Sequence, residues 1–281
     1  MSKKSTAFQH KFMRWMYRGK GIFNPLNTGW IDEHLACVRE WVANVFFYRK
    51  GDTVIMIDAG YHYERLEEKM GWLGLKPAQI SNVLLTHLDT DHIGAVEADG
   101  GGLFRNATVY LGEIENRYLT GERKRRVLYR LGSLPRVRIP NETVLLRDGQ
   151  VFTIGDIQIE CFLVPGHTWG HMVYLLDGRY LLTGDAIWLG ADGGYSFLAS
   201  LAEDNRLAVR ALAAFEAKLR ARGLRPLVIT GHTGYSSDLD FVFSHCDLCC
   251  KTSDKRYFNP AAPYDAYDES EDTEARAAVP L

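Results

Sequence analysis

Four side chains that can bind a metal ion lie close together in the sequence: His87, Asp89, Asp91 and His92. They follow the apolar run 83–85, a pattern typical of a buried strand. A strand that ends in a tight turn would project such residues from one edge of a sheet. Imidazole and carboxylate ligands together suit Zn²⁺, Fe or Mn, whereas a site made of thiolates alone is excluded in this segment.

Three later segments share one pattern, in which an apolar strand is followed by a small residue and then by a potential ligand. The ligands are His167 in Pro-Gly-His, Asp185 in Thr-Gly-Asp and His232 in Thr-Gly-His. Glycine before each of them lets the backbone turn sharply beside a bulky site. A lone histidine after a strand is usually a surface residue, so the recurrence is the informative feature. Together with the segment 87–92, it predicts a binuclear metal site.

Short apolar runs bounded by turn residues predict the strands that must position these ligands. The expected strands are 41–48, 53–57, 83–85, 107–111, 151–154, 157–164, 172–176, 180–183 and 227–230. Apolar residues at helical spacing predict a helix that ends at Gly74, another from His92 onward, and a third that opens with a capping box at 200–203 and closes at Gly223. Residues 113–138 are rich in arginine and are expected to form an inserted helical lid. The arginines are expected to lie on a solvated face of this helix, and contact with an anionic substrate is the alternative.

Composition places the chain among soluble globular proteins. It has 281 residues, of which 46% are hydrophobic and 24% charged, with a net charge of −2, so no overall field favours nucleic acid or an anionic membrane. No apolar run is long enough for a transmembrane helix, and a cytoplasmic protein acting on a small molecule is expected. The chain could act as a monomer or as a homodimer.

The five cysteines are odd in number and unevenly spaced, which does not indicate a secreted disulfide framework. Cys246, Cys249 and Cys250 lack the paired spacing of a zinc ribbon, and a structural role is expected for them. We expect a basic N-terminal arm or helix at 1–30, a main domain at 31–250 that contains the insert, and a loosely ordered tail at 251–281.

The order of these motifs resembles the metallo-β-lactamase fold superfamily. The matching pieces are His87-x-Asp89-x-Asp91-His92, Pro-Gly-His167-Thr, Thr-Gly-Asp185, Thr-Gly-His232 and the early strand end at Asp58, where that superfamily has a supporting aspartate. The resemblance covers roughly residues 35–235. It implies an α/β fold of the αββα type, with two mixed sheets packed face to face, helices outside, and metals at one edge.

The resemblance also implies a ligand set. His87, Asp89 and His167 would hold the first metal, Asp91, His92 and His232 the second, and Asp185 would bridge both. Two divalent ions, with Zn favoured over Mn or Fe, would lower the pKa of a shared water and supply a metal-bound hydroxide. Asp91 and Asp185 are the expected catalytic residues, with Asp91 orienting the nucleophile or protonating the leaving group.

Asp89 departs from the usual signature, which has histidine at that position. A carboxylate there would favour Mn or Fe, and flavodiiron oxidoreductases are similar in placing a glutamate at this point. Because aspartate is short, it could also fail to reach the metal, and an enzyme with one metal then remains an alternative.

Four further residues are candidates for contacts to the substrate or to a ligand: His171, Trp188, Tyr195 and Tyr235. Trp188 occupies the place of a catalytic tyrosine in lactonases of the family, which counts against a strict lactonase. We therefore expect a metal-dependent hydrolase of an ester, lactone, thioester or amide. The alternatives are a stand-alone diiron oxidoreductase and a non-catalytic binding module with this fold.

Overall fold

The computed structural model describes residues 23, 25–61, 65–97 and 102–250. Most of the expected arm at 1–30 and the whole expected tail at 251–281 lie outside the described residues, and both remain predictions. Among the described residues, no helix is long and apolar enough to cross a membrane.

The first large sheet has seven strands in the order β1-β2-β3-β4-β5-β6-β9. Its strands are β1 (Gly29–Trp30), β2 (Leu35–Glu40), β3 (Ala43–Lys50), β4 (Thr53–Ile57), β5 (Asn82–Leu84), β6 (Thr108–Gly112) and β9 (Thr143–Leu146). The pairs from β1 to β4 are antiparallel, and those from β4 to β9 are parallel. The predicted hairpin of 41–48 and 53–57 is thus confirmed as β3 and β4.

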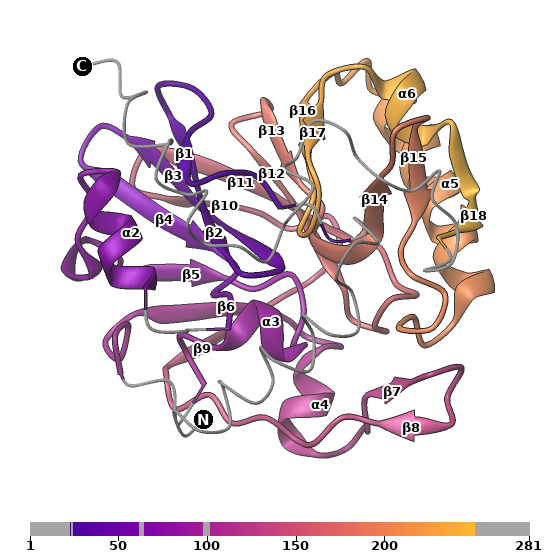
Figure 1. The fold of residues 1–281 in the computed structure, drawn as a ribbon, viewed down its shortest axis with the longest axis horizontal. Coiled ribbons are helices and arrows are strands. Elements are labelled where there is room, and N and C mark those ends of the chain that lie inside the picture. Colours follow the sequence, from indigo (N-terminus) through magenta and orange to yellow (C-terminus); the bar gives the residue numbers. More distant parts are fainter. Residues whose placement is uncertain (1–22, 24, 62–64, 98–101, 251–281) are drawn as a thin grey trace.

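The second large sheet has six strands in the order β10-β11-β12-β13-β16-β17. They are β10 (Val151–Ile154), β11 (Ile157–Leu163), β12 (Met172–Leu176), β13 (Tyr180–Leu182), β16 (Leu227–Ile229) and β17 (Tyr235–Ser236). Only β13 and β16 pair in parallel. A smaller sheet of β14 (Ile187–Leu189), β15 (Gly194–Ser196) and β18 (His245–Cys249) lies beside it (Figure 1).

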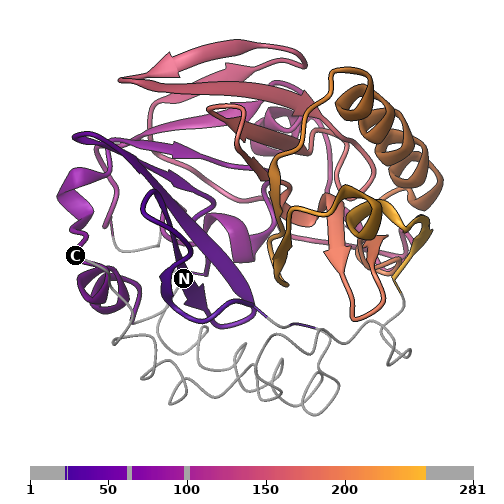
Figure 2. The same cartoon turned by 90° about the horizontal axis from the view of Figure 1, so that it is seen from above.

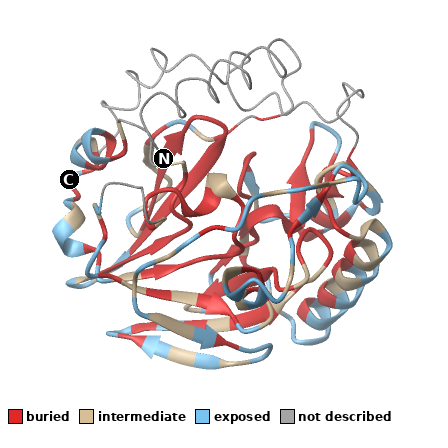
Figure 3. Cartoon of the chain, turned by 90° about the horizontal axis from the view of Figure 1, so that it is seen from below, coloured by how far each residue is buried: buried red, intermediate tan, exposed pale blue. Residues whose placement is uncertain are grey.

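Both faces of the first sheet are buried, because its strands are apolar at nearly every position. Successive side chains alternate between faces. In β2, Leu35 and Cys37 pack in the layer between the two sheets, whereas Ala36 and Val38 pack on the opposite face. Figure 3 shows the central strands of both sheets as almost continuously buried, whereas the edge strands β9 and β10 are partly exposed. This explains why continuous apolar runs, rather than alternation of polar and apolar residues, marked the strands in the sequence.

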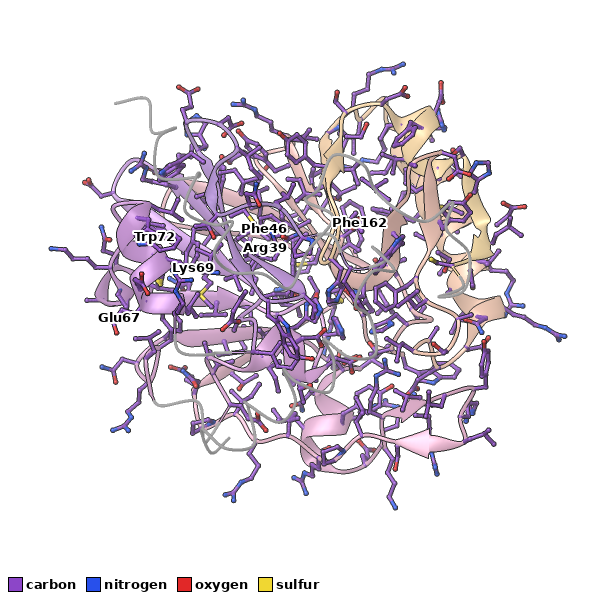
Figure 4. All side chains as sticks on the ribbon, in the orientation of Figure 1. Arg39, Phe46, Glu67, Lys69, Trp72 and Phe162 are labelled. Carbon is purple, nitrogen blue, oxygen red and sulfur yellow. The ribbon has the colours of Figure 1, made fainter. Side chains whose placement is uncertain are left out.

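Helices cover the two outer faces and complete an αββα sandwich (Figure 2). Helix α2 (Leu66–Trp72) packs Leu66 and Met70 on the first sheet, and α5 (Asn205–Ala221) packs Leu212, Phe215 and Leu219 on the second. In Figure 4, Lys69 of α2 points toward Arg39 of β2, and its buried ammonium donates a hydrogen bond to the Arg39 carbonyl oxygen. Phe162 lies on the outer face of the second sheet against Phe215.

The insert differs from the predicted helical lid. It contains one short helix, α4 (Asn116–Thr120), and a two-stranded hairpin of β7 (Arg126–Val127) and β8 (Gly132–Ser133), which projects from the body of the molecule (Figure 1). The backbone turns at Leu128, Tyr129 and Arg130, which all have positive φ. The arginine spacing suggested a helix face, but three successive left-handed residues end any helix.

Two helix starts also differ from prediction. Helix α3 (Thr90–Ile93) begins before His92, and Asp91 and His92 therefore lie within one helical turn. The predicted capping box at 200–203 is wrong, because α5 begins at Asn205 with Asp204 as its N-cap. Glu203 instead accepts hydrogen bonds from the Tyr118 hydroxyl and the Arg126 amide of the insert. Two short 3₁₀ helices, η1 (Pro77–Gln79) and η2 (Gly184–Ala186), also occur in the described residues. The last helix, α6 (Leu239–Phe243), follows β17.

The side chain of Asn44 in β3 ties the first sheet to the second. Its amide nitrogen donates to the carbonyl oxygens of Thr230 and Thr233 at 3.0 Å each. The backbone amide of Asn44 also donates to the Gly231 carbonyl at 2.8 Å. These bonds fix the loop after β16 against the start of β3, at the edge where the candidate ligands gather.

Candidate metal centre

The candidate ligands come from loops at the carboxyl ends of strands in both sheets. His87 follows β5, His167 follows β11, Asp185 lies in η2 after β13, and His232 follows β16. Asp91 and His92 lie in α3. The carboxyl ends of neighbouring parallel strands share one edge, which explains how distant segments converge. We call these six residues the histidine–aspartate cluster.

Three residues of the cluster, Asp91, His92 and His232, offer ligand atoms that all lie within 4.8 Å of one another. We call this the second position. The Nε2 atoms of His92 and His232 are 3.2 Å apart. Asp185 Oδ1 lies 3.3 Å from His92 Nε2 and 3.2 Å from His232 Nε2. Asp91 Oδ2 is 3.4 Å from His232 Nε2.

His87, His167 and Asp185 form a corresponding group, also within 4.8 Å, which we call the first position. The Nε2 atoms of His87 and His167 are 3.2 Å apart. The other carboxylate oxygen of Asp185, Oδ2, lies 3.5 Å from His167 and 3.8 Å from His87. Asp185 therefore turns one oxygen to each position, as the bridging role predicted from the resemblance requires.

Hydrogen bonds at Nδ1 orient three of the four histidines. His92 Nδ1 donates to Asp58 Oδ2 at 2.8 Å, His87 Nδ1 lies 3.0 Å from Thr86 Oγ1, and His232 Nδ1 donates to the Val42 carbonyl oxygen. Because Nδ1 carries the proton in this arrangement, Nε2 keeps its lone pair toward the cluster. Histidine ligands of metals are held in this way.

Asp58 supports the site as its place in the sequence indicated. Its carboxylate bonds His92 and also accepts from the Thr86 amide at 2.8 Å. Asp58 has a φ of 57°, a left-handed conformation that aspartate tolerates better than most residues. The turn after β4 therefore aims this carboxylate at the loop after β5.

Glycine is required at two of the strand ends. A Cβ atom on Gly184, which has a φ of 47°, would lie 2.5 Å from Thr86 Oγ1. A Cβ on Gly231 would lie 2.7 Å from Asp185 Oδ1 and 3.0 Å from His92 Cε1. The glycine before His232 thus makes room for the ligands themselves, whereas the sequence pattern predicted a sharp turn of the backbone there.

The charges around the two positions differ. At the second position, burial disfavours protonation, but Asp185, Asp58 and Asp91 outweigh it and hold the pKa of His92 well above its usual range. At the first position, burial and the nearby Arg125 guanidinium lower the pKa of His167 to about 3. Carboxylates therefore dominate the charge around the second position, whereas a guanidinium lies beside the first.

The donors of the second position fit a divalent ion. Metal bonds of about 2.0–2.2 Å at tetrahedral angles place neighbouring ligand atoms roughly 3.3–3.6 Å apart. Four of the separations among His92, His232 and the two carboxylates, 3.2 to 3.4 Å, are close to that spacing, and the separation of Asp91 Oδ2 from His92 Nε2 is 4.0 Å. In addition, buried Asp185 Oδ1 accepts no hydrogen bond from the described residues, although two imidazole nitrogens face it.

Asp89 lies beside the first position but is engaged by another partner. Its Oδ2 is 3.0 Å from His167 Nε2, and both of its oxygens also accept hydrogen bonds from Arg125, at 2.7 Å each. Arg125 precedes β7 in the insert. Sequence reasoning counted it among the arginines of a solvated face, yet Arg125 is only 6% exposed. No signal in the sequence singled it out.

Glu115 is a second residue that sequence reasoning missed. Its buried carboxylate accepts hydrogen bonds from the Leu88 amide at 3.0 Å, the Thr168 hydroxyl at 2.6 Å and the Gly170 amide at 3.1 Å. Burial raises the pKa of Glu115 to about 7. Glu115 thus links the start of the insert to the loops that carry His87 and His167.

The four other candidates have different surroundings. His171 Nε2 accepts a hydrogen bond from the Asp185 amide at 3.1 Å, so it positions the bridging residue. Trp188 is buried, with its ring centroid 6.0 Å from that of His232. The Tyr195 hydroxyl donates to Asp192 at 2.8 Å, and Tyr235 is 44% exposed rather than enclosed with the histidines.

Aromatic rings cover the cluster. Phe23 lies edge-on to His232 with centroids 5.0 Å apart, and Phe197 packs against His167 at 4.5 Å. The histidines of the cluster are at most 2% exposed, whereas Asp91 is partly exposed. Among the described members of the cluster, Asp91 is therefore the one that a substrate can reach most directly.

A pocket of about 370 Å³ adjoins the loop that carries Asp89. Its apolar lining includes Leu88, Leu134 and Val137, and its cationic lining comes from the insert. The cationic residues are Arg123, Lys124, Arg125 and Arg136. Arg123 stacks over the Trp169 ring at 4.3 Å. The insert therefore contributes positive charge to a pocket that is also lined by Leu88 and Thr90, on either side of Asp89, and by the acidic residue Glu115.

Similar proteins agree with the fold and with the metal chemistry. The chain is 28% identical over 156 residues to the probable polyketide biosynthesis zinc-dependent hydrolase BaeB of Bacillus velezensis, a match of 56% of this chain and 59% of BaeB. It is 29% identical over 148 residues to hydroxyacylglutathione hydrolase of Buchnera aphidicola, which is 52% of this chain and 47% of that protein. The chain thus spans about half the length of these relatives.

The comparison of structures supports the same fold. The chain superposes with a TM-score of 0.55 on a B3 metallo-beta-lactamase that has an active site glutamic acid, at 19% identity, covering 80% of this chain and 88% of the other. At 19% sequence identity, this similarity is evidence for a shared fold and not for a shared activity. The sequence profile of the metallo-beta-lactamase superfamily matches residues 38–232, which includes every residue of the histidine–aspartate cluster. The chain belongs to the metallo-beta-lactamase superfamily.

Proposed function

We propose that this protein is a metal-dependent hydrolase of a thioester or ester that carries an anionic group. The observation that carries the proposal is the convergence of buried imidazole and carboxylate donors around Asp185, at the separations that a divalent ion requires. Zn²⁺ is the favoured ion, because the donors are mainly imidazole and one relative is named zinc-dependent. A divalent ion held by Asp91, His92, Asp185 and His232 would supply Lewis acidity toward water and the substrate carbonyl.

The protein's own residues then have separate tasks. Asp58 and the Val42 carbonyl hold His92 and His232 in orientation through Nδ1, and His171 holds the Asp185 backbone. Asp91 is the partly exposed carboxylate of the second position. We assign it to accept a proton from the attacking water and to return that proton to the leaving thiolate or alkoxide.

Two observations support the substrate class. The pocket beside Asp89 carries cationic side chains from the insert, which suit a carboxylate or phosphate on the substrate. The relative named hydroxyacylglutathione hydrolase acts on a thioester by its name. The diiron alternative depends on Asp89 as a metal ligand, and the engagement of both Asp89 oxygens by Arg125 does not favour it.

The proposal is tested by metal analysis and turnover of natively purified protein. Zn²⁺ content is measured together with the hydrolysis of matched thioesters and esters, each in an anionic and a neutral form. Asp185→Asn should abolish turnover and lower metal content, because it removes the negative charge of the carboxylate that faces both positions. Asp192→Asn is the matched control, since Asp192 lies seven positions away and bonds Tyr195 rather than the cluster. Near-normal turnover in Asp185→Asn would show that the assignment is wrong.

A further inference from the structure

Arg125 enters the candidate metal centre from the insert and binds Asp89 with two parallel hydrogen bonds. Arg125 Nε donates to Asp89 Oδ1 and Nη2 to Oδ2, both at 2.7 Å. The two side chains are 7% and 10% exposed. This bidentate geometry is the strong form of an arginine–carboxylate pair, and both Asp89 oxygens are engaged by it.

The rest of the guanidinium is fixed by the protein around it. Nη1 donates to the Arg126 carbonyl at 2.6 Å, and Nη2 donates to the Leu201 carbonyl at 2.8 Å. The Glu203 carboxylate lies 3.8 Å from Nη1. Because backbone acceptors from two separate segments hold it, Arg125 is built into the site.

Arg125 also reaches the first position directly. Its Nη2 lies 3.2 Å from His167 Nε2. A guanidinium can only donate hydrogen bonds, so a bond from Nη2 has His167 Nε2 as its acceptor, whereas a protonated Nε2 donates to Asp89 Oδ2, which lies 3.0 Å away. In either case the Arg125–Asp89 pair engages the nitrogen that a metal ion at the first position would need. His167 also differs from the other three histidines of the cluster, because its Nδ1 has no hydrogen-bond partner among the described residues.

The charges of the side chains also differ between the first and the second position. Asp89 adds one negative charge where the family signature has a neutral histidine, and the Arg125 guanidinium cancels that charge in place. The second position keeps the carboxylates of Asp91 and Asp185, with Asp58 behind His92. A cation at the first position would instead lie next to a fixed guanidinium, which repels it.

We propose that the Arg125 guanidinium takes the place of an ion at the first position, and that the protein binds one divalent ion, at the second position. This rests on the proposed metal-dependent function but departs from the two-metal site that the family resemblance implied. Asp89 then acts as the anchor of Arg125 rather than as a ligand. The insert supplies the second positive charge of the site as a side chain.

The test is the number of ions bound, which does not depend on turnover. Protein stripped with a chelator is titrated with Zn²⁺ or Co²⁺ against a chromophoric competitor, and bound metal is counted after dialysis. The wild-type protein should bind one equivalent. Arg125→Ala should bind two, because His167 Nε2 and the Asp89 carboxylate are released to join His87 and Asp185. Arg123→Ala, in the same insert but stacked on Trp169, is the matched control and should stay at one.

A second variant decides the matter if Arg125→Ala does not fold. Asp89→Asn should leave the wild-type count of one equivalent unchanged, whereas it would remove one of two ions if Asp89 were a ligand. Two equivalents of similar affinity in the wild-type protein, or one equivalent in folded Arg125→Ala, would overturn the proposal. Two ions with hydrolysis would leave the proposed function standing, whereas no bound ion and no hydrolysis would refute that function as well.

Discussion

Replacing Asp58 with Asn tests whether this carboxylate holds His92 for metal binding. The substitution keeps the size of the side chain, and Asn tolerates the left-handed φ of 57° as well as Asp does. It converts one acceptor oxygen into an amide that can only donate. That amide must face either the Thr86 amide or His92 Nδ1, both of which donate to Asp58 at 2.8 Å.

The expected magnitude follows from that lost acceptor. One buried donor without a partner costs about 1–3 kcal/mol, which should appear in the free energy of unfolding of the metal-free protein. Loss of the partner that orients a histidine ligand lowers metal affinity about 10–100-fold. Chemical denaturation in chelator measures the first effect, and competition with a chromophoric chelator measures the second.

Asp238→Ala provides the control for general destabilisation. Asp238 caps α6 by accepting hydrogen bonds from the Asp240 and Phe241 amides, and its loss should cost about 1 kcal/mol. Metal affinity should not change in that variant. Wild-type metal affinity in Asp58→Asn would refute the reasoning, because it would show that His92 is oriented without this carboxylate.

Three further changes probe other parts of the site. Glu115→Gln should remove a pH dependence of the free energy of unfolding. Burial raises the pKa of Glu115 from 4.5 to about 7. The stability contributed by the protonated Glu115 side chain is therefore complete below pH 4.5 and is lost as the pH rises to about 7. At about 1.4 kcal/mol per unit this decline is about 3 kcal/mol, measured by denaturation of metal-free protein, and its persistence in the variant would contradict the assignment. Gly231→Ala should displace Asp185, costing about 1–3 kcal/mol of stability and lowering metal affinity, whereas Gly71→Ala, where a Cβ meets nothing within 4 Å, should bind metal normally. Lys124→Glu should raise KM for anionic thioesters severalfold and leave KM for neutral ones unchanged, and an equal effect on both would exclude a charge contact.

The strand ends were predictable because each combines a short buried strand, a glycine and a ligand-type residue. That local pattern led from the sequence to His167, Asp185 and His232, and the structure brings all three together with His87 and His92. A supporting role for Asp58 was implied by the family resemblance, and the structure shows that the residue it bonds is His92. The αββα fold followed from the family resemblance, and the buried runs of the strands are consistent with it.

The contributions of the insert could not be predicted from local patterns. Arg125 meets Asp89 across 36 positions of sequence, and Glu203 meets Tyr118 across 85. Arginines at 117–138 have the spacing of a solvated face, and nothing in that spacing distinguishes the buried one. Glu203 resembled part of a capping box, but its carboxylate bonds the insert, and Asp204 caps α5 instead.

The bonds from Asn44 to the loop that carries His232 span 186 and 189 positions of sequence, so they close late during folding. The second position takes Asp91 and His92 from α3, which follows β5 of the first sheet, and His232 from the loop after β16 of the second sheet. It can therefore form only after the two sheets have docked. An ion that binds this arrangement alone adds stability in proportion to the logarithm of its concentration over its Kd. A higher metal concentration should therefore slow the global unfolding of the chain and leave the rate of its early collapse unchanged. The metal centre thus stabilises the completed sandwich and does not nucleate its folding.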